Sequence, residues 1–122
     1  MSNTKINIPG LNADSGLSFC DGELSIYLQS LNLFTSNMSK KLDIMRNVTQ
    51  EKMQDYMICA HGAKSISEYI GAEETHKTAK QLEMMAKEGN LSGILAINDT
   101  FINNTEKLID NIKNWLKDNK AT

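Results

Sequence analysis

Proline is nearly absent from this chain of 122 residues, and cysteine, glycine and aromatic residues are scarce. The one proline, Pro9, stands near the start, so no proline ring interrupts a helix in the rest of the chain. Seven glycines exclude a collagen, and a hydrophobic content of 40% excludes a chain too polar to fold. The scarcity of helix-breaking residues therefore predicts a chain that is helical over most of its length.

Metal ligands and disulfides are equally hard to assemble from this composition. The two cysteines, Cys20 and Cys59, lack the spacing of metal ligands and are too few for a disulfide framework. We expect free thiols, which are typical of a cytoplasmic protein. No pair among Cys59, His61 and His76 has the i, i+4 spacing of two ligands on one helix face. The sequence thus predicts no metal site, and His76 is expected on an exposed helix surface.

Charge and hydropathy exclude two further classes of partner. The formal net charge is −2, and the basic residues are spread along the chain, so the cluster that neutralises a phosphate backbone is missing. We therefore expect no nucleic-acid binding. Apolar runs are only a few residues long, and residues 1–13 are polar, so we expect neither a membrane span nor a secretory signal. The cytoplasm is the expected location.

Apolar residues recur every three or four positions in four long segments, which is the period of an amphipathic helix. Asp14 is a candidate N-cap for a short first helix, and Thr49 is a candidate N-cap for the second long one. Thr105 or Asn104 falls where the last apolar stripe should continue, which weakens the pattern there. The predicted helices span residues 14–19, 23–45, 49–70, 73–88 and 92–116.

Short connections between long helices favour antiparallel packing of neighbours in the chain. The predicted fold is therefore all-α: an up-and-down antiparallel four-helix bundle with a short extra N-terminal helix. We expect an irregular lead-in over residues 1–12, a single bundle domain over 13–118 and a frayed tail over 119–122.

A helical wheel of the segment 49–70 separates a core face from an exposed face. Cys59, Ala63, Ile66 and Ile70 fall on the core face with Tyr56 beside them, and His61 points the opposite way. An exposed histidine in the middle of a helix is often without function. The exposed face around it predicts a partner-binding surface formed by Gln54, Met57, Ile58, Ser65 and Glu68.

Lys64, one turn after His61, gives the histidine a chemical context. A lysine there disfavours the charged imidazole and leaves a ring nitrogen available as a nucleophile. If that nitrogen took up a phosphoryl group, the ammonium of Lys64 would attract the new negative charge. The pair is mildly unfavourable at rest and favourable after phosphorylation.

Four segments together resemble the histidine-containing phosphotransfer (HPt) domain. They are 60–65 (Ala-His-Gly-Ala-Lys-Ser), 70–74 (Ile-Gly-Ala-Glu-Glu), 79–83 (Ala-Lys-Gln-Leu-Glu) and the upstream 16–22 (Gly-Leu-Ser-Phe-Cys-Asp-Gly). The resemblance extends over about residues 10–117. Ser65 stands where the family more often has glycine, and Ala63 is smaller than the leucine usual at that position.

The resemblance implies a phosphocarrier of a multistep phosphorelay. His61 would accept a phosphoryl group from the aspartate of one receiver domain and pass it to another, and Lys64 would stabilise the phosphoryl charge. The implied partners are response-regulator receiver domains and a hybrid histidine kinase. Mg²⁺ would arrive with the receiver, so the carrier needs no cofactor of its own. Such a protein is not an enzyme, lacks ATP-dependent kinase activity and can act as a monomer.

Two other interpretations stay open at this stage. The same bundle and exposed face would serve an adaptor that binds a receiver or kinase without phosphotransfer, with His61 incidental. The domain could also belong to a larger kinase, although the initial methionine and the Lys-Ala-Thr end favour a free-standing protein.

Overall fold

The computed structural model describes residues 6–119 and contains five helices and no strand within that range. The predicted all-α class is thereby confirmed. The helix bounds lie close to those predicted from the apolar period. They are α1 (Ala13–Phe19), α2 (Leu24–Arg46), α3 (Met53–Ile70), α4 (Glu73–Lys87) and α5 (Leu91–Asp118).

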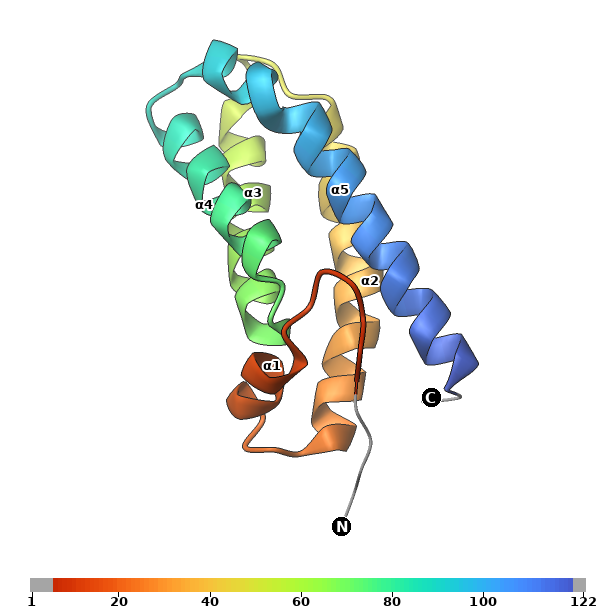
Figure 1. Cartoon of the computed structure of the whole chain (residues 1–122). Coiled ribbons are helices and arrows are strands. Elements are labelled where there is room, and N and C mark those ends of the chain that lie inside the picture. The colour runs from red at the N-terminus through yellow and green to blue at the C-terminus, as the bar shows by residue number, and fades with distance from the viewer. Residues whose placement is uncertain (1–5, 120–122) are drawn as a thin grey trace.

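The four long helices lie side by side, and short α1 covers one end of α2 and α3 (Figure 1). Each long helix contacts two others: α2 packs on α3 and α5, and α4 packs on α3 and α5. Within residues 6–119, no helix is long and apolar enough to cross a membrane.

The core is built from the stripes that the sequence predicted. On α2 the fully buried side chains recur at steps of three and four, so one face of this helix is closed to solvent. Burial of each large apolar side chain is worth about 1.5–3 kcal/mol, which makes this stripe a main source of stability. Its buried members are Tyr27, Leu31, Phe34, Met38, Leu42 and Met45.

Small side chains are buried on both α3 and α4, two helices that pack extensively on each other. Ala60 and Ala63 on α3 and Ala79 on α4 are each 0% exposed. Methyl groups at these positions allow two helix backbones to approach more closely than leucines would. The packing of these two helices also lets Glu83 of α4 reach side chains on the exposed face of α3.

One polar side chain buried in the core is paired across helices. Asn98 of α5 is 2% exposed, and its carboxamide accepts the Tyr56 hydroxyl proton (2.7 Å) and donates to the Met45 carbonyl (3.0 Å). One side chain thus links α5 to α3 and α2. The apolar pattern of the sequence did not identify this link.

Thr105 resolves the weak point in the last stripe. It is 1% exposed, and its hydroxyl donates to the Phe101 carbonyl at 2.7 Å, so the buried oxygen is satisfied within its own helix. Asn104, the alternative, is exposed. Threonine can occupy a core position of a helix when its hydroxyl bonds back one turn.

Two predicted N-caps were wrong. Asn12 caps α1 in place of Asp14, because its side-chain oxygen accepts the Ser15 N–H at 3.1 Å. Thr49 also accepts an N–H, that of Lys52 at 3.2 Å, but this bond closes a turn and α3 begins only at Met53.

The lead-in is irregular over residues 6–12, as predicted, with a turn at Pro9-Gly10. It also contributes to the core, since Ile8 is 2% exposed.

Gly71 ends α3 in the left-handed conformation (φ +84°), where a Cβ would collide with the Asn12 carbonyl oxygen. Residues 1–5 of the lead-in and 120–122 of the predicted tail lie outside the described residues.

The link through Asn98 leads to a stability prediction. Asn98→Ala strands the Tyr56 hydroxyl and the Met45 carbonyl in the core, so we expect a loss of about 2–3 kcal/mol in the free energy of unfolding. Exposed Asn103 on the same helix is the matched control, and Asn103→Ala should change stability by less than about 0.5 kcal/mol. Chemical denaturation measures both, and equal effects would contradict the assigned role.

Candidate functional site

His61 lies on the solvent side of α3 with 62% of its side chain exposed, as the helical wheel predicted. Cys59 and Ala63 are buried on the opposite side, also as predicted. Ile66, expected in the core, is only partly buried, because the centre of the core face falls on Ala60 and Ser67. His61 therefore lies on the exposed face of α3, and the opposite face of this helix is buried in the core.

Glu83 of α4 contacts two side chains of this exposed face, His61 and Lys64. One carboxylate oxygen, Oε2, lies 2.7 Å from Nδ1 of His61, and the other, Oε1, lies 2.7 Å from Nζ of Lys64. The residue is 4% exposed, so a full negative charge is held almost out of solvent. The expectation of a bare His61–Lys64 pair was incomplete, since a carboxylate bridges the two groups.

Hydrogen bonding keeps the Glu83 carboxyl ionised. The hydrogen bond from Lys64 is the largest influence and, with smaller help from His61 and Lys87, lowers the pKa of the Glu83 carboxyl from 4.5 to about 2. Burial acts in the opposite direction but is outweighed. At neutral pH the group is therefore a carboxylate and can only accept hydrogen bonds.

The ionised carboxylate fixes the orientation of the imidazole. Because Glu83 only accepts, Nδ1 of His61 must carry the proton that it donates. In the neutral ring the lone pair then resides on Nε2, which has no hydrogen-bond partner in the described part of the chain. The arrangement presents an oriented nucleophilic nitrogen at the surface.

A second lysine lies at the same carboxylate. Nζ of Lys87, one turn after Glu83 on α4, is 3.6 Å from Oε2, and the Lys87 side chain is 60% exposed. Glu83, Lys87 and His61 together line a cavity of about 320 Å³ whose remaining walls are Met57 and Ile58. His61 thus stands at the edge of a hollow that is lined by apolar side chains on one side and charged side chains on the other.

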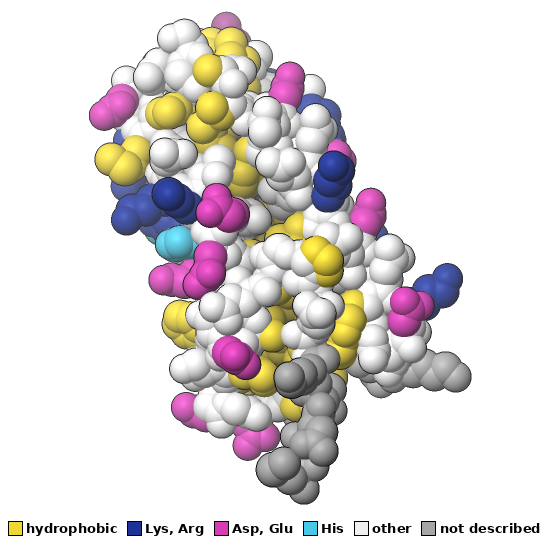
Figure 2. All heavy atoms as spheres, viewed as in Figure 1, with side chains coloured by type: hydrophobic (Ala, Val, Ile, Leu, Met, Phe, Trp, Pro, Cys, Tyr) yellow, Lys and Arg dark blue, Asp and Glu magenta, His cyan; other side chains and the backbone are white. Residues whose placement is uncertain are grey.

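The predicted partner-binding residues lie around this hollow. Gln54, Ile58, Ser65 and Glu68 are exposed, and Met57 is partly buried. Ile58 is 59% exposed, a large apolar surface next to a charged cluster. On the face drawn in Figure 2, acidic and basic side chains lie close to exposed hydrophobic side chains.

His76 differs from its prediction as an exposed surface residue. It is partly buried, and its Nδ1–H donates to the Lys64 carbonyl at 2.9 Å. This bond joins the first turn of α4 to α3 beside the site. His76 has a structural partner, and no group of three or more candidate metal ligands occurs among residues 6–119.

Sequence reasoning quoted Glu83 as part of a motif but missed its role. The signal was available in the period of α4, where Ala79, Leu82 and Ala86 mark the buried stripe. Glu83 falls within that stripe, and an acid on a buried face is almost always paired. The identity of its partners came only from the packing of α4 on α3.

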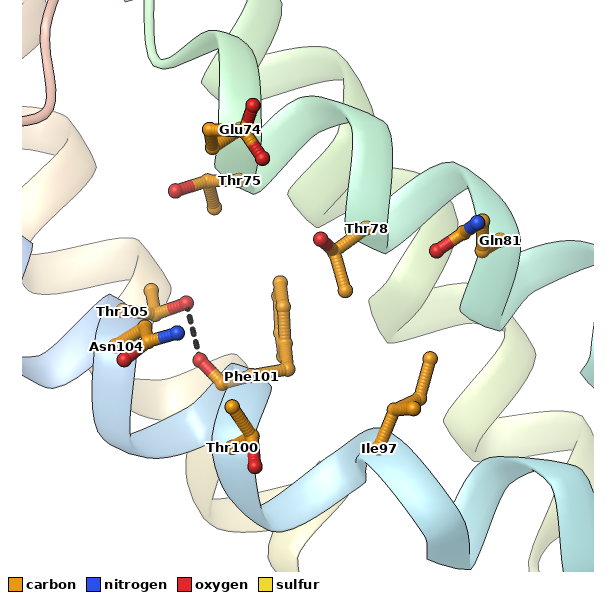
Figure 3. Close-up of a pocket in the computed structure, with 9 residues that line it drawn as sticks. All are labelled: Glu74, Thr75, Thr78, Gln81, Ile97, Thr100, Phe101, Asn104 and Thr105. Carbon is orange, nitrogen blue, oxygen red and sulfur yellow. Dashed lines mark hydrogen bonds between the residues drawn. The ribbon is translucent and has the colours of Figure 1, made fainter.

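A second cavity of about 300 Å³ lies between α4 and α5, away from His61 (Figure 3). Threonine, asparagine and glutamine side chains surround an apolar floor formed by Ile97 and Phe101. Glu74 is the single charged residue of its lining. With no nucleophile of the histidine type, this cavity is a poorer candidate for group-transfer chemistry.

No family model, no curated protein and no solved structure matches this chain.

The paired Glu83 leads to a pH-dependent stability prediction. Its folded pKa of about 2 lies below the ordinary 4.5, so its stabilising contribution is complete above pH 4.5 and is lost as the pH falls toward 2. Glu83→Gln should therefore cost about 1–3 kcal/mol at pH 7 and progressively less below pH 4.5. Urea denaturation of both proteins from pH 7 to pH 3 tests this. A difference that stays constant over that range would contradict it.

Proposed function

We propose that the protein is a histidine phosphocarrier of a two-component phosphorelay, with His61 as the phosphoacceptor. The observation that carries the proposal is the Glu83 carboxylate, which holds Nδ1–H of His61 and the ammonium of Lys64 at 2.7 Å each. The carboxylate orients Nε2 of His61 toward solvent and holds the ammonium of Lys64 close to the imidazole. Positioning and charge stabilisation are the main requirements of phosphoryl transfer.

In the proposed step, the Nε2 lone pair of His61 attacks the phosphorus of a receiver aspartyl phosphate. The new N–P bond forms as the P–O bond to the aspartate breaks, and the leaving carboxylate keeps the bonding electrons. The imidazole becomes a cation, since Nδ1 keeps its proton. The Glu83 carboxylate at 2.7 Å stabilises that charge, and Lys64 lies within one turn to attract the phosphoryl oxygens.

The remaining catalytic groups belong to the partner in this proposal. Mg²⁺ would arrive on the receiver, so the carrier would need no metal site of its own. The carrier would use no ATP by itself, would act as an intermediate and not as an enzyme, and would work as a monomer in the cytoplasm. Its partners would be response-regulator receivers and a hybrid histidine kinase.

The proposal includes the finer topology of the fold. We take the four long helices as an up-and-down antiparallel bundle with α1 as the extra helix. Two observations support it: the connections between consecutive long helices are short, and each long helix contacts two neighbours. This topology places the middle of α3 on the outside, where a receiver can reach it.

An adaptor without phosphotransfer is the second candidate, and the exposed Ile58 beside His61 favours it as much as it favours a carrier. The adaptor predicts that the imidazole is dispensable. Receiver binding that persists in His61→Ala, combined with no labelling of the wild-type protein, would select the adaptor.

His61→Gln tests the phosphocarrier directly. Glutamine can still donate a hydrogen bond to Glu83, so we expect the helical circular dichroism spectrum and the melting temperature to change little. Phosphate acceptance from a ³²P-labelled receiver should be abolished, because no nucleophilic nitrogen remains. The label on the wild-type protein should be lost in acid, as phosphohistidine is.

The second histidine provides the matched control. Nδ1 of His76 is tied to a backbone carbonyl, so His76→Gln should still accept the label. Labelling of His61→Gln at the wild-type level, or an acid-stable label on the wild-type protein, would overturn the assignment.

A further inference from the structure

We propose that Lys41 of α2 is a further phosphoryl-binding cation for His61, seated against the helix backbone at Gly62. The inference rests on the proposed function, and it concerns a residue that neither the apolar pattern nor the resemblance singled out. It assigns Lys41 to the phosphoryl oxygens and makes Gly62 the residue that positions it.

The end of the Lys41 side chain fits against α3 because Gly62 has no side chain. A Cβ built on Gly62 would lie 2.7 Å from Cε and 3.3 Å from Nζ of Lys41. Real Cβ atoms do not approach another carbon as closely as 2.7 Å, so the end of the lysine occupies the space that any other residue would fill. The half-buried Lys41 side chain therefore lies against the backbone of α3 at Gly62, the residue that follows His61 in the chain.

Within the described part of the chain, Lys41 differs from Lys64 and Lys87 in having no carboxylate partner. Lys64 and Lys87 both contact the Glu83 carboxylate, at 2.7 and 3.6 Å. Among residues 6–119, no carboxylate lies within 4.0 Å of the Lys41 ammonium. A partly desolvated ammonium without a partner is unfavourable, and an anion delivered next to it relieves that cost.

The charge of Lys41 also acts on Cys59, which is buried on the core side of α3. Burial raises the pKa of the Cys59 thiol, and the positive charge of Lys41 opposes this rise. Cys59 precedes Gly62 by three residues, so the two lie one turn apart on neighbouring sides of the helix. The contact of the Lys41 side chain with Gly62 is the geometric observation that places the ammonium against α3.

Gly62, where Lys41 lies, and Lys64, which pairs with Glu83, are on opposite sides of His61. On the helical wheel Gly62 is turned 100° from His61 toward α2, whereas Lys64 is turned about 60° the other way, toward α4. A phosphoryl group on Nε2 would therefore meet a cation on each flank. On the α4 flank Lys64 and Lys87 share the single Glu83 carboxylate, whereas no carboxylate among residues 6–119 lies within 4.0 Å of the Lys41 ammonium.

In the transfer step Lys41 keeps its proton and forms no covalent bond. As the N–P bond forms and the donor bond breaks, the phosphoryl oxygens come to rest beside Nε2 with close to two negative charges. The ammonium of Lys41 would donate hydrogen bonds to them. We expect it to speed uptake of the group and to slow hydrolysis of the phosphohistidine.

The test uses phosphoramidate, a small donor that removes any contribution from partner docking. Nε2 of His61 attacks its phosphorus, the P–N bond of the donor breaks and ammonia leaves. Uptake and loss of phosphohistidine are followed by ³¹P NMR on the full chain. Lys41→Ala should slow uptake about fivefold and shorten the lifetime of the phosphohistidine by a similar factor.

Gly62→Ala is the second, independent variant. Alanine is a better helix former than glycine, and its methyl group meets only the mobile end of Lys41, so the protein should fold at least as stably. It should nevertheless reproduce the kinetic defect of Lys41→Ala, because the alanine methyl group occupies the space of the Lys41 Cε and displaces the ammonium. Lys40→Ala is the matched control: Lys40 is the exposed neighbour on α2, and its removal should leave both rates unchanged.

The outcomes separate this inference from the proposed function. If wild-type His61 takes up the label and both variants behave like Lys40→Ala, Lys41 has no phosphoryl role. If Lys41→Ala is slow only with a phosphorylated receiver and normal with phosphoramidate, Lys41 contacts the partner and this assignment is also overturned. Labelling that survives in His61→Gln would instead overturn the proposed function itself.

Discussion

The Glu83 carboxylate is almost closed to solvent, yet it stays ionised because an imidazole and two ammonium groups surround it. Removing such a charge from water is costly, and only close partners with good geometry compensate. The need to satisfy Glu83 therefore fixes how α4 lies on α3. The same contacts orient His61, so the charge pairing that joins α3 and α4 also holds the imidazole in place.

Small residues make this geometry possible. Ala60, Ala63 and Ala79 let α3 and α4 approach closely enough for a glutamate side chain to span the gap. On the other flank of α3, the missing side chain of Gly62 lets a lysine of α2 rest against the backbone. The chemistry of the site thus depends as much on what is absent beside His61 as on the groups that surround it.

Periodicity carried the prediction of the fold a long way. The stripe of α2 and the outward direction of His61 followed from spacing alone, because a helix rotates each residue by a fixed angle. Helix starts were predicted less well. Asn12, Asp14 and Thr49 are all good capping residues, and the choice among them depends on which N–H groups the folded backbone leaves within reach. The Tyr56–Asn98 link was missed because a polar residue on an apolar stripe does not name its partner.

The sequence by itself determined the helices, their buried faces and the presence of an exposed histidine one turn from a lysine, since these are properties of local spacing. Only the tertiary structure decided which charges meet there. Glu83 and Lys87 come from α4 and Lys41 from α2, and side chains from different helices are brought together by packing that no local period encodes. The sequence alone therefore identified His61 and Lys64. The positions of Glu83, Lys87 and Lys41 relative to them depend on how α2 and α4 pack on α3.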